Sequence, residues 1–397
     1  MRHLAVAAAA IIVCALPGCG DDAPDQDPDP DAGTVDAQPD VDADPGVTWP
    51  FELPPGFPVP RLPDGERLTA ELAELGRYLF YDKRLSGNGT QACAGCHDQA
   101  RAFTDGRDTG LGSEGAILAR NSMSLTNVAY NPVQTWANPL LGTLEAQAAV
   151  PLFGETPIEL GASAHAQEIL DRLAADADYP ARFAAAFPGE TELFTWGHVI
   201  AAIGAFERRL ISGDSPVDRF RRGDATALTD QERRGYELFF SERLECFHCH
   251  GGFNFTIAVD HATQSEPAVH YFNDGLYNIG DGGYPAGNQG LYEFTLDPMD
   301  RGRFRPPTLR NIGVTAPYMH DGSVATLEEV VDLYARGGRL ITTGPNAGDG
   351  ALNPNKNALV AGFEIDAGER DDLLAFLRAL TDEAFLTDPT LADPFAP

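Results

Sequence analysis

The sequence predicts a mainly α-helical protein with two similar domains and long ordered loops, preceded by a signal peptide and a disordered tether. Three observations predict this arrangement. The N-terminus has an apolar run followed by a segment dominated by Asp, Pro and Ala. Two motifs with the same cysteine spacing begin at Cys93 and Cys246, 153 positions apart, and a similar stretch precedes each. Segments with helical periodicity also alternate with segments rich in Gly, Pro and Asn.

Residues 1–18 have the features of a lipoprotein signal peptide. A short basic start is followed by an apolar run over residues 4–16, which is too short to span a membrane. Leu16-Pro17-Gly18-Cys19 resembles a bacterial lipobox. We therefore expect Cys19 to carry a lipid and to anchor the protein in the periplasm or at the outer cell envelope. An ordinary signal peptide cleaved nearby is the alternative, and it also predicts export.

Residues 19–50 are expected to form a disordered acidic tether. The chain has 28 Lys and Arg against 59 Asp and Glu, so its formal net charge is −31. Ten of these acidic residues, all aspartates, lie between Cys19 and Gly46, and without them the net charge of the rest of the chain is −21. Such a stretch buries too little apolar surface to fold. A cation-binding acidic tail is the alternative, but the stretch lacks the Gly-punctuated geometry of a calcium loop.

The acidity also limits the kind of partner. A negative surface repels phosphate, which argues against nucleic-acid binding. With a net charge of −21 outside the tether, we expect a basic protein partner.

Four of the six cysteines form two C-x-x-C-H motifs, Cys93-Ala94-Gly95-Cys96-His97 and Cys246-Phe247-His248-Cys249-His250. This pattern is the signature of covalent c-type haem attachment. Two thiols three residues apart reach the two vinyl groups of one porphyrin, and the adjacent imidazole ligates the iron. A shared zinc site would need all four thiols close together, and thioredoxin-like motifs lack the obligatory His. We predict two haem c groups, with His97 and His250 as axial ligands.

Each motif is expected to belong to its own cytochrome c-like haem domain, with boundaries at residues 51–222 and 223–388. The helix end before the first motif, Glu74–Phe80, is similar to Arg233–Phe239 before the second, and each contains a Gly that allows close packing. Further helices are expected over 165–187 and 194–211, after the caps at Thr326 and Asp366, and long ordered loops over 251–325 and 338–362.

Two segments, residues 75–107 and 303–338, resemble the bacterial di-haem cytochrome c peroxidase/MauG superfamily. They read LGRYLFYDKRLSGNGTQACAGCHDQARAFTDGR and RFRPPTLRNIGVTAPYMHDGSVATLEEVVDLYARGG. Residues 135–155 and 241–255 are most similar to the methanobactin-associated di-haem enzymes (MbnH-like), a MauG-related branch. The resemblance covers roughly residues 60–380. It implies that the first, N-terminal haem is the peroxide site.

The resemblance implies a distal site built from Glu159 and Gln147, with Pro151 lining the same pocket. A carboxylate above an open iron can shuttle the peroxide proton. By sequence alone Glu155 competes with Glu159, and either is otherwise an ordinary surface charge. The family's peroxidases often carry a distal His in the loop after the first motif. The loop here, residues 109–115, contains neither His nor Met, so we expect a five-coordinate first haem.

Two aromatic residues match family positions near the second haem. Trp136 matches a Trp between the two haems, although the Asp-Gly-Arg that usually follows is replaced here by Ala-Asn-Pro. Tyr334 lies 14 residues after His320, where the family's peroxidases carry an axial Met and MauG-like enzymes carry Tyr. An anionic phenolate stabilises ferric and higher oxidation states of the iron. Without the resemblance, both residues would be interpreted as core residues.

Asn121, Thr315 and Pro317 match the family's inter-haem calcium site. A side-chain amide, two backbone carbonyls and water supply the oxygen ligands that Ca²⁺ prefers. The alternative interpretation is that all three are turn residues.

The resemblance implies a peroxide-dependent di-haem oxidoreductase. High-valent iron, formed with hydrogen peroxide, would oxidise an aromatic residue, Trp in first place, on an exported protein partner. In the methanobactin-associated branch this partner is a small copper-binding protein whose Trp becomes kynurenine. One alternative is a cytochrome c peroxidase that takes electrons from a small redox protein. Another is a non-enzymatic di-haem electron carrier.

Overall fold

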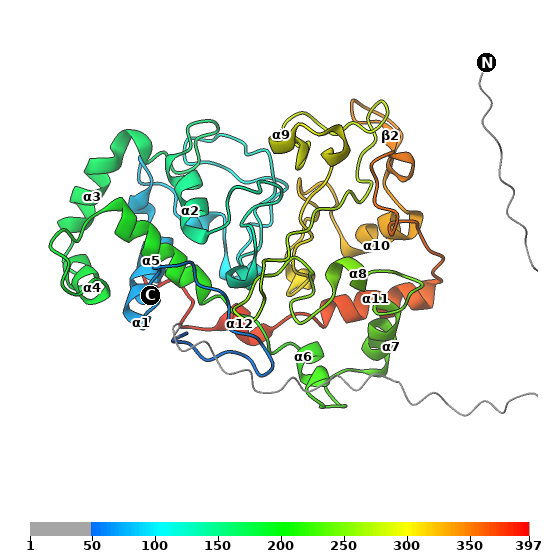
Figure 1. Cartoon of the computed structure of the whole chain (residues 1–397), viewed down its shortest axis with the longest axis horizontal. Helices are drawn as coiled ribbons and strands as arrows, with labels where there is room; N and C mark the ends of the chain where they lie inside the picture. The colour runs from blue at the N-terminus through cyan, green and yellow to red at the C-terminus, as the bar shows by residue number, and fades with distance from the viewer. Residues whose placement is uncertain (1–48, 397) are drawn as a thin grey trace, which may run out of the picture. The chain divides into compact units, whose positions relative to one another are not determined.

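A computed structural model describes residues 49–396 of the chain (Figure 1). The predicted signal peptide, Cys19 and the tether up to residue 48 lie outside the described residues. The described part begins with Trp49, which packs against the first hydrophobic cluster and meets Phe51 edge-to-face. The predicted tether boundary at residue 50 therefore lies too far along the chain. No helix within residues 49–396 has the length and apolar character needed to cross a membrane.

The described part is mainly helical, as predicted, and its one sheet is a two-stranded antiparallel ribbon that pairs Leu340 with Asp349. The α-helices are α1 (Ala70–Tyr81), α2 (Leu144–Phe153), α3 (Ala166–Ala174), α4 (Tyr179–Ala186), α5 (Trp196–Arg208), α6 (Pro216–Arg221), α7 (Asp230–Phe239), α8 (Phe247–His250), α9 (Tyr292–Thr295), α10 (Leu327–Arg336), α11 (Ala367–Arg378) and α12 (Glu383–Thr387). The strands are β1 (Leu340–Ile341) and β2 (Gly348–Asp349). The 3₁₀ helices are η1 (Lys83–Leu85), η2 (Cys93–Gly95), η3 (Gln99–Arg101), η4 (Val128–Tyr130), η5 (Ser163–His165), η6 (Pro298–Asp300), η7 (Ile312–Val314) and η8 (Gly350–Leu352).

The helix before each haem motif packs closely against a later helix, α1 against α5 and α7 against α11 (Figure 1). A glycine permits each approach. A Cβ on Gly76 would lie 1.8 Å from the carbonyl oxygen of Ala202, and a Cβ on Gly235 would lie 2.0 Å from that of Asp372. The close packing that the sequence predicted at both glycines is therefore confirmed, and the two halves share one construction.

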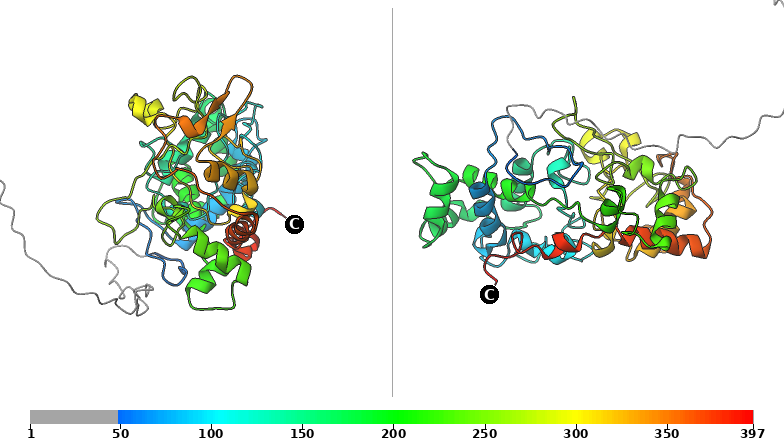
Figure 2. Two further views of the ribbon diagram at one scale, coloured as in Figure 1. Left: turned by 90° about the vertical axis from the view of Figure 1, so that its right-hand side faces the viewer. Right: turned by 90° about the horizontal axis from the view of Figure 1, so that it is seen from below.

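Buried hydrophobic side chains form two clusters. The first joins α1, α3, α4 and α5, and the second joins α7, α10 and α11. The C-terminal segment departs from a simple division along the chain, because Phe385 and Leu391 pack into the first cluster. Arg77 and Tyr81 of α1 donate hydrogen bonds to the carbonyls of Ala392 and Leu391, at 2.8 and 2.9 Å. Figure 2 shows the same return of the chain from α11 towards α1.

The region predicted as helical over residues 165–187 forms two helices, α3 and α4. The break has a local cause: the side chain of Asp176 accepts hydrogen bonds from the backbone N–H groups of Asp178 and Tyr179. Helices α2 and α6 were not expected from the sequence. The stretches 251–325 and 338–362 consist of loops, short turns of helix and the β1–β2 ribbon, in agreement with the prediction.

Candidate active site and haem pockets

The first motif folds into a single 3₁₀ turn, η2, which leaves the thiols of Cys93 and Cys96 free. The backbone N–H of His97 donates to the carbonyl of Cys93 at 3.0 Å. His97 Nδ1 lies 2.8 Å from the carbonyl oxygen of Phe103. Burial lowers the pKa of His97, so the ring is neutral and Nδ1 is its donor. This tautomer leaves the Nε2 lone pair available for a metal ion.

The second motif repeats this arrangement on α8. Cys246 and Cys249 are free, and the N–H of His250 donates to the carbonyl of Cys246 at 3.0 Å. His250 Nδ1 lies 3.2 Å from the carbonyl oxygen of Pro307. Burial lowers the pKa of His250 to about 4, so this imidazole is also a neutral ligand. Both motifs therefore present two thiols and one oriented imidazole.

A large cavity opens beside the second motif. Its empty volume, counted together with the open solvent at its mouth, is about 1770 Å³. The lining is mainly apolar and includes Cys246, Cys249, His250 and Tyr334. A flat, mostly apolar group of porphyrin size fits this lining.

Residues 121–124 form a wall shared by the two sites. They line the second cavity, and burial lowers the pKa of His97 against the opposing influence of the Phe103 carbonyl, the Asp105 carboxylate and the Met123 carbonyl. Trp136 lines the same cavity, and its Nε1 donates to the carbonyl of Asn121 at 3.0 Å. The hydrogen bond from the indole thus fixes the backbone of this wall at Asn121.

Comparisons with known proteins agree with this geometry. The profile of the di-haem cytochrome c peroxidase family matches residues 70–226. The methylamine utilization protein MauG of Methylorubrum extorquens is 32% identical over 345 residues, which cover 86% of each chain. The cytochrome-c peroxidase IdrP2 of Denitromonas iodatirespirans is 31% identical over 350 residues, covering 84% of this chain and 88% of the relative. The chain belongs to the di-haem cytochrome c peroxidase family.

A solved structure extends the likeness within this family. The crystal structure of a MauG-like protein associated with microbial copper homeostasis is 50% identical. It superposes with a TM-score of 0.86 and covers 88% of this chain and 100% of its own. The family comprises di-haem oxidoreductases, so membership implies two haem c groups in this protein.

The chain's own residues fit these two haems. Four free thiols stand in two pairs, two neutral imidazoles are oriented by carbonyls, and one large cavity faces the second pair. His320 adds a buried ring nitrogen, Nε2, without a hydrogen-bond partner, and its ring stacks on Phe304 with centroids 3.7 Å apart. Such an unsatisfied group on the cavity wall is expected where a polar ligand completes the site.

Tyr334 lies on α10, whose N-cap Thr326 accepts a hydrogen bond from Glu329 and whose C-cap is Gly337. Its side chain lines the cavity that His250 also lines. Burial, then the carboxylate of Asp274, then the thiol of Cys249 raise its pKa well above 10. The phenol is therefore neutral, and a ferric iron bound to it would displace its proton. Thioether ligation by Met123 or Met319, which line the same cavity, is the alternative to Tyr334.

The structure distinguishes the two candidates for the distal acid–base group, Glu159 and Glu155. Glu159 is half-buried, burial raises its pKa, and its charge contributes to the raised pKa values of both Cys93 and Cys96, behind burial itself. Glu159 therefore lies close to the first motif. Glu155 is exposed, and its carboxylate accepts a hydrogen bond from Ser163 at 3.1 Å. The geometry favours Glu159 as the acid–base group.

Gln147 and Pro151 both lie on α2 and are half-buried. The backbone N–H of Leu160 donates to the carbonyl of Pro151 at 2.9 Å, which joins α2 to the segment that carries Glu159. The N–H of Ser113 donates to the carbonyl of Glu159 at 2.7 Å. The loop after the first motif is thereby fixed against the predicted distal residues.

The three predicted calcium ligands lie on one cavity wall. Asn121, Thr315 and Pro317 all line the second cavity. The Asn121 side-chain nitrogen donates to the carbonyl of Arg107 at 2.7 Å, which leaves its side-chain oxygen free. This arrangement suits a cation bound by oxygen atoms, and calcium binding remains a prediction.

Sequence reasoning missed three ionisable residues near the two sites, of which Glu207 and Arg305 are buried and Asp274 is half-buried. Glu207 on α5 is 5% exposed, and after burial its charge is the strongest influence raising the pKa of Cys93. Asp274 lines the second cavity, and burial raises its pKa to about 6. Arg305 is 1% exposed and also lines that cavity. For Glu207 the only signal in the sequence is a charge that directly follows the apolar stretch of residues 199–206.

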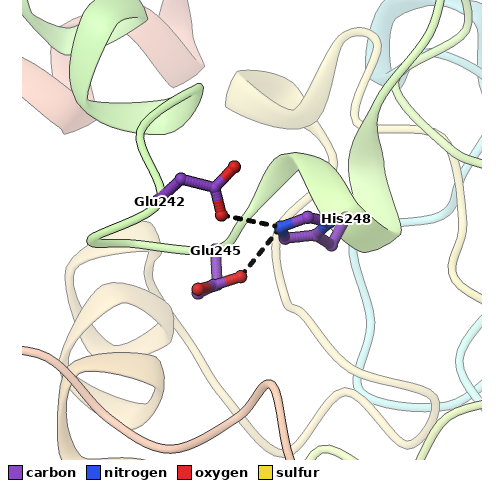
Figure 3. Close-up of side chains that lie close together, drawn as sticks. All are labelled: Glu242, Glu245 and His248. Carbon is purple, nitrogen blue, oxygen red and sulfur yellow. Dashed lines mark hydrogen bonds and ion pairs between the residues drawn. The ribbon is translucent and has the colours of Figure 1, made fainter. Parts of the chain in front are cut away.

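Two histidines outside the axial positions make other contacts. His198 packs on Phe187, with ring centroids 3.8 Å apart. His248 lies inside the second motif. Figure 3 shows its ring between Glu242 and Glu245, with Nε2 at 3.2 and 2.9 Å from their carboxylates. Its ring therefore contacts two carboxylates beside the attachment turn.

Proposed function

We propose that the protein is a peroxide-dependent oxidase of MauG type, which oxidises an aromatic residue, Trp in first place, on an exported protein partner. The observation that carries the proposal is Tyr334, which faces the second cavity together with His250. A second observation supports it: the loop of residues 109–115 after the first motif offers no His or Met to close the first site.

When bound, the first haem supplies the iron at which hydrogen peroxide is reduced. Peroxide takes up two electrons and two protons and gives two molecules of water. Glu159 would take the first peroxide proton and return it to the departing oxygen, and burial raises the pKa of this carboxyl, which helps it to hold the proton between the two steps. Gln147 orients the peroxide, and Pro151 keeps the pocket closed to excess water.

The two electrons come from the partner's aromatic side chain. Trp136 lies on the wall shared by the two sites, so its indole is a route for electrons between them. Tyr334 would ligate the second haem as phenolate and favour the oxidised state of its iron. Asn121, with the carbonyls of Thr315 and Pro317, would hold a calcium ion that keeps this wall rigid.

The partner is a protein with a basic surface. The net charge of −21 outside the tether attracts positive charge and steers association. The 50% identical structure belongs to a protein associated with copper homeostasis, which supports a copper-binding partner. Export by the signal peptide and lipidation of Cys19 would place this protein in the periplasm or at the outer envelope, where an exported partner can meet it.

One incubation tests the proposal. The di-ferric protein is mixed with peroxide and an exported copper-binding protein, and the partner is analysed by mass spectrometry. We expect one oxygen atom added to a partner Trp per peroxide consumed: the Trp loses two electrons and two protons and takes its oxygen from water, while both peroxide oxygens leave as water. Glu159→Gln is expected to abolish most of this product, whereas the exposed control Glu155→Gln retains it. Unmodified partner in the presence of peroxide turnover would contradict the proposal.

A cytochrome c peroxidase is the second candidate, because relatives such as IdrP2 carry that name. A parallel assay with reduced cytochrome c separates the two functions. Rapid cytochrome oxidation by peroxide without any change in the partner would favour the peroxidase. A protein that reacts with neither and only exchanges electrons would be a di-haem carrier.

A further inference from the structure

A buried arginine on the wall of the second cavity has no carboxylate partner. Arg305 is 1% exposed, and none of its contacts within residues 49–396 is an ion pair. Its guanidinium donates only to neutral oxygens, Nε to the carbonyl of Thr135 at 3.3 Å and Nη1 to the side chain of Asn131 at 3.2 Å. An unpaired buried charge is strongly unfavourable, so a site of this kind needs an anion.

A neighbouring arginine shows how the fold treats a buried guanidinium that has its counter-ion. Arg310 is also 1% exposed, and it forms a two-pronged ion pair with Asp218, with N–O distances of 2.8 and 2.9 Å. Arg305 has no such carboxylate, and its Nη2 has no hydrogen-bond partner among the described residues. The difference identifies Arg305 as the guanidinium whose counter-ion is not part of the polypeptide.

A second donor near Arg305 is also unsatisfied. The hydroxyl of Tyr271 is buried and has no hydrogen-bond partner. The antiparallel bridge between Phe272 and Phe304 sets Tyr271 opposite Arg305, and the charge of Arg305 opposes the rise that burial gives the pKa of Tyr271. Arg305 supplies only donors and the phenol of Tyr271 offers another, which together suit an acceptor with two oxygens.

We propose that Arg305 and Tyr271 form the binding site for a propionate carboxylate of the haem attached at Cys246 and Cys249. Arg305 lines the same cavity as these thiols, and a carboxylate accepts two parallel hydrogen bonds from a guanidinium. The site is a positioning site, because it acts on the haem through its carboxylate and does not touch the iron.

The backbone adds a functional link. The N–H of Arg305 donates to the carbonyl of Trp136 at 2.8 Å, so one residue holds both the propionate and the indole. The inference rests on the haem that family membership implies and is independent of the partner that is oxidised.

Arg305→Met in the haem-loaded protein tests the site. We expect the propionate-bending band of the second haem to shift in the resonance Raman spectrum, because its hydrogen bonds are lost. The midpoint potential of the same haem should move to more negative values, because a nearby positive charge favours the reduced state. Arg303→Met is the matched control. Arg303 lies two residues before Arg305, and its side chain is 37% exposed and paired with Asp300, so the variant removes the same charge from outside the site. We expect the control to leave the Raman band unchanged.

A second variant, Arg305→Lys, tests the site if Arg305→Met does not fold. Arg305→Lys keeps the charge but loses the two-pronged geometry, so the Raman band should shift while the potential stays near the wild-type value. If a small free anion occupied the site in place of the propionate, the midpoint potential of the second haem in the wild type would depend on chloride concentration at constant ionic strength. With a propionate in the site, this potential is independent of chloride. An unchanged Raman band in both Arg305 variants, or a chloride-dependent wild-type potential, would overturn the inference.

Discussion

Replacing Glu207 by Gln should change how the stability of the protein depends on pH. The Glu207 carboxyl is 5% exposed, and its Oε2 has no hydrogen-bond partner. The adjacent Glu145 carboxylate is already paired with Arg208, whose Nη2 donates to it at 2.9 Å. Burial first, and then the charge of Glu145, raise the pKa of Glu207 from 4.5 to about 8, against the opposing charge of Arg208.

The sign follows from proton binding. Between pH 4.5 and about 8 the folded protein holds a proton on Glu207 that the unfolded chain has released. The free energy of unfolding therefore falls by about 1.4 kcal/mol per pH unit as the pH rises through this window. Above the window Glu207 causes no further fall. The full window corresponds to an upper limit of about 5 kcal/mol, which is comparable to the whole stability of many domains.

The assay compares Glu207→Gln with wild type by guanidinium denaturation of the haem-loaded protein from pH 5 to pH 9. Gln has the shape of the protonated acid, so the two proteins should have similar stability at pH 5. As the pH rises to about pH 8, the free energy of unfolding of the variant should become increasingly larger than that of the wild type. The exposed Glu190→Gln serves as the control for a change of charge alone. A difference between Glu207→Gln and wild type that stays constant from pH 5 to pH 8 would refute the reasoning.

Four further experiments test the site and the fold. Tyr334→Phe should alter only the spectrum of the haem at the second motif, and unchanged absorption would point to thioether ligation. Glu159→Gln should slow the reaction with peroxide by roughly 10²–10⁴, measured by stopped flow, as expected for loss of an acid–base group. Asn121→Ala should weaken calcium binding roughly tenfold or more in titration calorimetry, since one lost ligand interaction of about 1.4 kcal/mol suffices for that factor. Gly235→Ala should lower the stability by about 1–3 kcal/mol in thermal unfolding, because its Cβ would lie 2.0 Å from the Asp372 carbonyl oxygen.

The features predicted best from the sequence are those contained in a few consecutive residues. Both attachment motifs are of this kind, because thiol spacing and the adjacent imidazole depend only on one helical turn. Gly76 and Gly235 were also predicted correctly, since a glycine at the same place in two similar helices indicates a close approach to another helix. Boundaries were less accurate where contacts far along the chain decide them. Trp49 belongs to the folded part because it packs against the first cluster.

The buried charges show why the rest of the site could not be predicted. Glu207 follows a run of buried apolar residues on α5, and its burial depends on the packing of α5 against α1. Arg305 lies in a loop without periodicity, so no pattern indicates which way its side chain points. In each case the informative observation is an uncompensated polar atom, which exists only after segments far apart in sequence have come together.

The wall between the two haem sites explains how a calcium site and a route for electrons could depend on one another. The N–H of Asn121 donates to the carbonyl of His320 at 2.9 Å, and the carbonyl of Asn121 accepts from the indole of Trp136 at 3.0 Å. The carbonyl of Trp136 in turn accepts from the N–H of Arg305. A change at the side-chain oxygen of Asn121 therefore acts on the indole through one backbone unit. Calcium removal should accordingly perturb the tryptophan environment, which a shift of Trp136 fluorescence in the haem-free protein would detect.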